Sequence, residues 1–275
     1  MTQKSKIVLT CAALALGALS VSGQTATSTP APAPAAAAPA PAAPTSSWVI
    51  TAPFVSQYMF RGVRLGGPSF EPSVEFDSGA LALGVWTNFP ISDKVVGQSD
   101  PEIDPYGSYT FTLSDSMSIA PGFTWYNYPN ATESNGFYKT TFEPSVAFNY
   151  TVAGVTITPK LYYDMVLKGP TYELNVAFTL PLKDMGSELD FAGTVGTYKW
   201  DDAAKDASPS VKNYGDYWLI GVTMPISISA NGKILLGLAY TEGSNNYYKQ
   251  SGSPKAVNTA ALGRGVVTIG YKITF

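Results

Sequence analysis

Pairs of carboxylates are the groups in this sequence best suited to chemistry. They occur as Glu102/Asp104, Glu188/Asp190 and Asp201/Asp202. Two carboxyl groups on either side of a sugar can act as a glycosidase, but acids at i and i+2 also result from any polar face of a β-strand. The chain has no histidine, which removes the usual base of acyl-transfer triads and the commonest metal ligand. We therefore expect no enzyme activity, no cofactor and no bound metal.

The last ten residues, 266–275, indicate which elements carry these side chains. One face of this segment is apolar or aromatic and consists of Val267, Ile269, Tyr271, Ile273 and Phe275. The other face carries Thr268, Gly270, Lys272 and Thr274. Such a pattern is typical of the closing strand of a bacterial outer-membrane barrel, with one face toward lipid and the other toward a wet lumen. A half-buried strand of a soluble sandwich has the same period, so this strand leaves both folds open.

Alternation of this kind continues through the region from Trp48 to Phe275, which is rich in Tyr, Thr, Val, Phe and Gly. Charged residues share the face opposite the large apolar side chains, as a bilayer would enforce, because a Lys or Arg on the lipid face costs roughly 2–4 kcal/mol at the midplane. No second run of 18 apolar residues follows the N-terminal region, which argues against a helical membrane protein. The region is therefore predicted to be all-β.

Connection lengths distinguish the barrel from the sandwich. About twelve strands are predicted, at residues 48–63, 70–76, 80–90, 103–113, 116–127, 142–150, 155–163, 172–182, 188–195, 214–229, 233–241 and 266–275. Tight turns follow the even-numbered strands, and mostly longer polar segments follow the odd-numbered ones. Short turns on one rim and long loops on the other are the layout of a transmembrane antiparallel up-and-down β-barrel, whereas a Greek-key sandwich has no reason to alternate in this way.

Aromatic residues are predicted to form belts at the two membrane interfaces. The belt near the long loops contains Tyr58, Phe60, Phe89, Tyr126, Tyr163, Tyr172, Trp200, Trp218 and Tyr240. The belt near the short turns contains Trp48, Phe76, Tyr150 and Phe275. By strand parity, the lumen is predicted to be lined by Arg61, Glu71, Glu75, Glu143, Lys160, Glu173, Glu188, Asp190 and Lys272.

The N-terminal region sets the cellular compartment. Residues 1–23 combine Lys4 and Lys6 with an apolar run and a small-residue end, which is the pattern of a cleaved secretory signal peptide. Residues 24–47 are an Ala/Pro-rich segment, predicted to be a disordered linker. We therefore expect an outer-membrane β-barrel at 48–275. Its expected partners are outer-membrane lipid and the barrel assembly machinery, with Phe275 as the assembly signal.

The predicted first strand ends in Tyr58-Met59-Phe60-Arg61-Gly62-Val63. This segment, after a signal peptide and before about 200 residues of barrel pattern, resembles the TorF-type porin family of Gram-negative bacteria. The resemblance implies an outer-membrane barrel and leaves the substrate undefined. Two roles for Arg61 remain open from the sequence, namely an ion pair with a wall carboxylate that braces the first strand and a contact with substrate.

One heptapeptide is repeated, as Phe70–Phe76 (FEPSVEF) and Phe142–Phe148 (FEPSVAF). Either duplication of a four-strand unit or chance similarity between barrel strands explains it, and Glu71 and Glu143 are predicted to join salt-bridge networks in the lumen. The 17 Lys and Arg residues against 20 Asp and Glu argue against nucleic-acid binding. The predicted function is a passive, weakly cation-selective pore for small solutes. The alternative is a closed barrel that binds a partner or stabilises the envelope.

Overall fold

A computed structural model describes residues 46–92, 101–130, 139–200, 214–243 and 264–275. The predicted signal peptide and nearly all of the predicted linker lie outside these residues. The described strands form a closed antiparallel barrel of twelve strands, so the predicted fold class is confirmed. Among the described residues, no helix is long and apolar enough to span a membrane.

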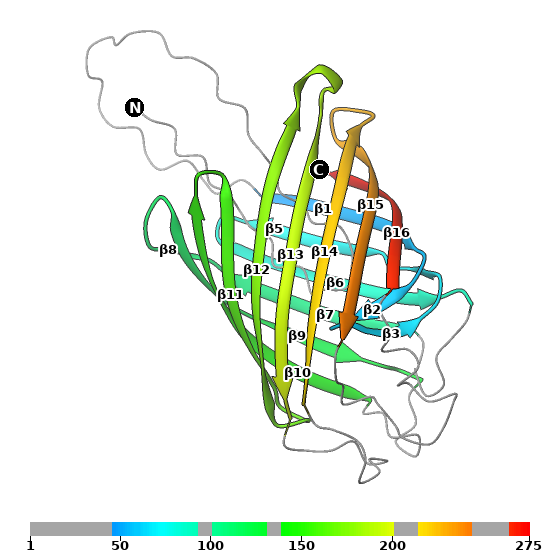
Figure 1. Ribbon diagram of the computed structural model, residues 1–275, viewed down its shortest axis with the longest axis vertical. Coiled ribbons are helices and arrows are strands. Elements are labelled where there is room, and N and C mark those ends of the chain that lie inside the picture. Colours follow the sequence, from blue (N-terminus) through cyan, green and yellow to red (C-terminus); the bar gives the residue numbers. More distant parts are fainter. Residues whose placement is uncertain (1–45, 93–100, 131–138, 201–213, 244–263) are drawn as a thin grey trace.

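Eight wall strands follow one another around the barrel from the middle of the chain to its C-terminal end (Figure 1). These are β9 (Met117–Asn127), β10 (Thr140–Val152), β11 (Val155–Asp164), β12 (Gly169–Leu182), β13 (Ser187–Lys199), β14 (Tyr214–Ser227), β15 (Gly232–Gly243) and β16 (Arg264–Thr274). A 3-10 turn, Lys183–Met185, joins β12 to β13.

The N-terminal part of the wall is less regular. Its strands are β1 (Ser46–Val55), β4 (Ser69–Phe70) with β5 (Ser73–Ser78), β6 (Leu81–Pro90), and β7 (Glu102–Tyr109) with β8 (Phe111–Thr112). Both β4 and β5 lie between β1 and β6, so together they make one wall strand. Similarly, β7 and β8 both pair with β9.

The barrel closes between its first and last strands. In Figure 1, β1 (blue) runs beside β16 (red), and their register pairs Val49 with Thr274 and Val55 with Thr268. Backbone hydrogen bonds between Trp48 and Phe275, at 3.2 and 2.9 Å, finish this seam. The start of the wall and its end therefore lie at the same rim, and closure leaves no unpaired sheet edge there.

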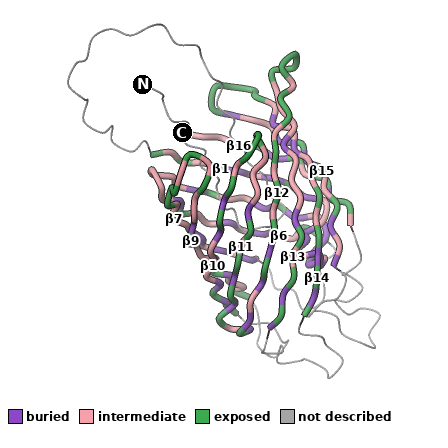
Figure 2. The backbone as a smooth tube through the Cα atoms, turned by 60° about the vertical axis from the view of Figure 1, so that its left-hand side comes forward, coloured by how far each residue is buried: buried purple, intermediate pink, exposed green. Residues whose placement is uncertain are grey.

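Side chains alternate between the outside and the inside of the wall, as Figure 2 shows by the alternation of exposed and buried residues along each strand. Outward apolar side chains such as Ile220, Leu238 and Ile269 are 55–61% exposed. Several buried positions on the same strands carry polar residues, for example Thr223 and Thr241. This inversion, with the apolar face outside, is the arrangement of a barrel in a bilayer rather than of a soluble sandwich.

The predicted first strand is the one element that is wrong. The wall strand β1 ends at Val55, and residues 58–66 form a separate two-stranded sheet of β2 (Tyr58–Phe60) and β3 (Val63–Gly66). A strand of 48–63 would be longer than every described wall strand, the longest of which, β12 and β14, have 14 residues. The excess length is used for a hairpin that leaves the wall.

Candidate functional site

The β2–β3 hairpin is held by a tight turn at Arg61-Gly62. Phe60 pairs with Val63 across the turn, and both central residues have positive φ, 47° for Arg61 and 77° for Gly62. This is the left-handed pattern of a type I′ turn, in which Asn and Gly are the usual residues. An arginine in this conformation is strained, and such strain persists only where the surroundings hold the residue in place.

Apolar contacts pack the hairpin inside the barrel. Tyr58, Val63 and Leu65 are 0–4% exposed and form one cluster with Trp86 of β6 and Tyr106 of β7. On the other side, Met59 packs with Val55 and Val266. The Tyr58 hydroxyl donates a hydrogen bond of 2.7 Å to Glu102, whose carboxylate is itself buried. The hairpin is therefore part of the core.

The tip of the hairpin contacts two parts of the wall. A Cβ atom on Gly62 would lie 2.6 Å from the backbone nitrogen of Gly243, at the end of β15. No side chain fits in that space, so a glycine is required both for the turn and for this close approach. The neighbouring Arg61 contacts β10 and β11, so the hairpin tip contacts wall strands distant from its own root between β1 and β4.

Arg61 forms a buried ion pair with Glu143 of β10. Its Nη2 lies 2.9 Å from Oε1 and 2.8 Å from Oε2 of that carboxylate, and the two side chains are 6% and 0% exposed. The guanidinium carbon also lies 4.8 Å from the ring centroid of Phe60 and 5.0 Å from that of Tyr162, which is cation–π geometry. The Tyr126 hydroxyl donates to Glu143 at 3.0 Å.

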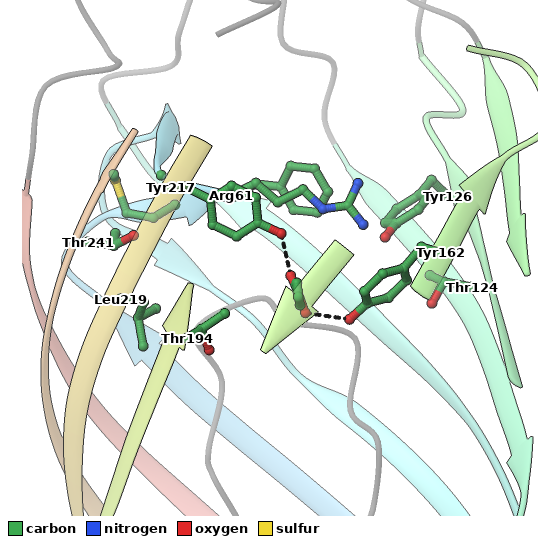
Figure 3. A pocket seen from close by; sticks show the side chains of 12 residues that line it. Arg61, Thr124, Tyr126, Tyr162, Thr194, Tyr217, Leu219 and Thr241 are labelled. Atoms are coloured by element: carbon green, nitrogen blue, oxygen red, sulfur yellow. Dashed lines mark hydrogen bonds between the residues drawn. The ribbon is translucent and has the colours of Figure 1, made fainter. Parts of the chain in front are cut away.

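A second carboxylate, Glu173 of β12, lines the same region. Tyr162 donates to its Oε2 at 2.7 Å and Tyr217 donates to its Oε1 at 2.5 Å. In Figure 3, the Arg61 guanidinium points between Tyr217 on one side and Tyr126 and Tyr162 on the other. A cavity of about 30 Å³ lies among these groups and the hairpin residues Met59 to Gly62, with Thr124, Thr194, Leu219 and Thr241 completing its lining.

Most of the other residues predicted for the lumen lie apart from this site. Glu71, Glu75 and Asp190 are buried. Tyr106 donates to Glu75 at 2.9 Å, and Thr179 donates to Asp190 at 2.7 Å.

Three further predicted residues carry the remaining charges. Glu188 faces Lys233 at 3.9 Å, the Nζ of Lys160 lies 4.5 Å above the Tyr162 ring, and Lys272 pairs in register with Lys233. The structure thus brings together Arg61, Glu143 and Glu173, with Lys160 beside them as the register partner of Glu173, and places the others elsewhere on the wall. Within the part of the chain that the structure describes, no three Asp or Glu side chains are arranged to hold a metal ion.

Four aromatic residues predicted for the outer belt lie inside instead. Tyr58, Tyr126 and Trp200 are 1–9% exposed, and Phe60 packs against Tyr126 with ring centroids 5.9 Å apart. Exposed positions are taken by the other predicted members near the long loops: Phe89, Tyr163, Tyr172, Trp218 and Tyr240. Tyr58 and Phe60 belong to the hairpin and Tyr126 to the site, whereas Trp200 stacks on Tyr198 with ring centroids 4.3 Å apart.

Sequence reasoning also missed Tyr162 and Tyr217, which hold Glu173. The signal that was available concerned the hairpin: Gly62 lies between two short apolar segments, and a glycine, which readily adopts positive φ, indicates a turn in such a place. That signal would have separated the hairpin from the first wall strand.

A model of the family described as "Bacterial protein of unknown function (Gcw_chp)" matches residues 41–270. The chain belongs to this family. A search of curated proteins gives no significant match.

Solved structures similar to this family member include two porins. The KdgM porin superposes with a TM-score of 0.52 at 12% identity, covering 82% of this chain and 99% of the porin. The NanC porin superposes with a TM-score of 0.50 at 11% identity, covering 82% of this chain and 98% of the porin. At this identity the likeness concerns the fold, which is that of a channel-like outer-membrane barrel.

Proposed function

We propose that the protein resides in the bacterial outer membrane and is a passive, weakly cation-selective pore for small solutes. The observation that carries this proposal is the closed barrel with an apolar outer face and a buried interior rich in carboxylates. Such a barrel needs no catalytic group, because a polar interior lowers the cost of moving a hydrated solute through hydrocarbon. We propose accordingly that it is not an enzyme.

Sequence features support the same location. We assign residues 1–23 to a cleaved signal peptide, 24–47 to a linker and 48–275 to the barrel, and the Tyr58–Val63 segment to a TorF-type porin motif. Phe275 is 63% exposed at the closing seam, consistent with recognition by the barrel assembly machinery. The fold that the chain shares with the KdgM and NanC porins adds support for a channel.

Charges on the inner wall support cation selectivity. Among the described residues, the buried carboxylates include Glu71, Glu75, Glu143, Glu173 and Asp190. The cations that share the predicted inner face are Arg61, Lys160, Lys233 and Lys272, and Arg61 is already paired with Glu143. A net negative wall attracts cations, and this bias falls as salt shortens the Debye length from about 10 Å at 0.1 M to about 3 Å at 1 M.

Planar-bilayer recordings of the purified protein test the proposal. Under a KCl gradient, the reversal potential is expected to show a preference for K⁺ that declines as total salt rises. Asp190→Asn, which removes a buried inner carboxylate, should reduce that preference. Asp115→Asn, at an exposed turn, is the matched control and should change it less. A preference for Cl⁻ would overturn the assignment of the inner wall.

A closed barrel is the second candidate, favoured by the hairpin itself. The hairpin buries Arg61, and the cavity beside it is only about 30 Å³, which is room for a few water molecules. If protein that is shown to be folded gives no conductance, the barrel is closed and serves as a structural or partner-binding element of the envelope.

A further inference from the structure

The groups around Arg61 form a cage that is complementary to an organic cation. We define the cage as Phe60, Tyr126, Tyr162, Tyr217, Glu143 and Glu173. Two of its rings lie 4.8 and 5.0 Å from the guanidinium carbon, and one of its carboxylates accepts from the guanidinium at 2.8 Å. Aromatic faces and carboxylates are the two kinds of group that bind guanidinium and ammonium ions most strongly.

Hydrogen-bond directions in the cage exclude an anion. Tyr126 donates its hydroxyl proton to Glu143, and Tyr162 and Tyr217 donate theirs to Glu173. The tyrosines are therefore left with acceptor lone pairs and π faces toward any ligand. The positive charge of Arg61 is already matched by Glu143. An anionic solute would meet two carboxylates here, whereas a cation would meet carboxylate and phenol oxygens and aromatic faces, with Lys160, over the Tyr162 ring, as the neighbouring positive charge.

The present occupant of the cage is attached to the hairpin and not to the wall. Arg61 sits at the turn with φ of 47°, a conformation that is strained for arginine. The cavity of about 30 Å³ adjoins it. A competing cation would thus gain the cage contacts while allowing the turn residue to relax, and it would leave Glu143 paired.

We propose that the cage is a binding site for organic cations with a guanidinium or alkylammonium group, which enter it by displacing the Arg61 side chain. The inference rests on the proposed pore function in one respect, because it assigns these cations as solutes that the pore recognises. Binding to the cage, however, can be measured without any conductance.

An emptied cage tests the chemistry directly. Arg61→Gly removes the guanidinium and suits the positive φ of the type I′ turn, so the hairpin geometry is retained. In detergent, low millimolar guanidinium chloride should raise the unfolding temperature of this variant saturably, whereas equal NaCl or urea, the neutral analogue of guanidinium, should not. Wild-type protein, whose cage is filled, should show a much smaller shift.

A second substitution in the Arg61→Gly protein shows whether the cage residues are responsible for guanidinium binding. Glu143→Gln in the Arg61→Gly background should weaken guanidinium binding by about tenfold or more, since a charge-assisted hydrogen bond is lost. Glu188→Gln in the same background, a carboxylate outside the cage, should leave it intact. Absence of a guanidinium-specific shift in folded Arg61→Gly, or equal weakening by both second changes, would overturn the proposal.

Current recordings of the wild-type pore supply a test that does not depend on a variant. Butylguanidinium added to the long-loop side should reduce the wild-type current more than butylurea does. As a further expectation, the current through Arg61→Gly should be more sensitive to butylguanidinium than that of wild type. Equal effects of the two compounds on wild type would mean that the cage only holds the hairpin in place and binds no organic cation. If the wild-type barrel does not conduct, the pore function fails, and the binding measurements in detergent alone decide the cage.

Discussion

Arg61 and Glu143 form a fully desolvated ion pair, so each partner depends on the other. We predict that Glu143→Gln lowers the free energy of unfolding by about 3–5 kcal/mol, because a buried guanidinium is left without its counter-charge. The measurement is equilibrium unfolding in urea of the protein reconstituted into lipid vesicles.

Two companion variants make this prediction specific. Arg61→Gln combined with Glu143→Gln removes both charges and should recover much of the loss, because no lone charge stays buried. Glu188→Gln breaks a pair of 3.9 Å whose lysine is 43% exposed and should cost at most about 1 kcal/mol. A Glu143→Gln cost no larger than that of Glu188→Gln would show that the hairpin does not depend on the ion pair.

Individual residues show where sequence reasoning succeeds and where it ends. Period-2 alternation predicted an inward Glu143 and Glu173, and both are buried. The partner of Arg61 could not be chosen, because Glu143 is 82 residues away and reaches it only through the register of the barrel. Tyr217 was not singled out, since a tyrosine at an inward position is distinguished only by the carboxylate it meets.

The hairpin is the element that the sequence pattern conceals. Successive side chains of Tyr58-Met59-Phe60 and Val63-Arg64-Leu65 point to opposite sides as they do in the wall, because a hairpin inside a barrel has the same period as the wall. Aromatic residues at its start also match an interfacial belt. Only strand length and the Arg61-Gly62 turn separate the two, and the direction in which the hairpin folds is set by contacts with β6, β7, β10 and β15.

We predict that the hairpin limits conductance. Replacing residues 57–67 with a short Gly/Ser linker removes the side chains that fill this part of the interior and should raise the single-channel conductance severalfold. Planar-bilayer recordings measure the effect, with heat-modifiable gel mobility as the check that the barrel has folded.

A matched change elsewhere isolates the hairpin. Replacing Lys183–Gly186, the exposed turn between β12 and β13, with Asn-Gly should leave conductance near the wild-type value, because a two-residue hairpin turn joins the same strands. An unchanged conductance in the folded hairpin variant would place the narrowest point of the barrel elsewhere.

At the scale of the whole molecule, the barrel follows from one physical constraint. In a bilayer every backbone group must pair within the sheet and every outward side chain must be apolar. These two demands give period-2 alternation and an even strand number, and both can be read along a chain without knowing its contacts. The twelve strands were therefore predictable. The β2–β3 hairpin was not, because it lies inside the barrel, where neither demand applies.

Adjacent residues on β16 test whether the outer face meets lipid. Ile269 is 55% exposed on the outside, and Thr268 is its inward neighbour at the same depth. We predict that Ile269→Lys costs roughly 2–4 kcal/mol of unfolding free energy in vesicles, as a lysine near the midplane does, and that Thr268→Lys costs clearly less. Equal costs would contradict a bilayer around this face.

Orientation in the membrane gives the last prediction. Asn130 is exposed at the long-loop end, and Met185 is 65% exposed at the short-turn end. Long loops of bacterial barrels face the exterior and short turns face the periplasm. Cysteine at position 130 should therefore react with an impermeant maleimide on whole cells, whereas cysteine at position 185 should react only after the outer membrane is permeabilised.

The sequence has a single natural cysteine, Cys11, within the proposed signal peptide, so the mature protein should give no background. The reverse labelling pattern would invert the barrel and place the Arg61 hairpin at the periplasmic mouth, where an organic cation from outside would reach the cage only after crossing the rest of the pore.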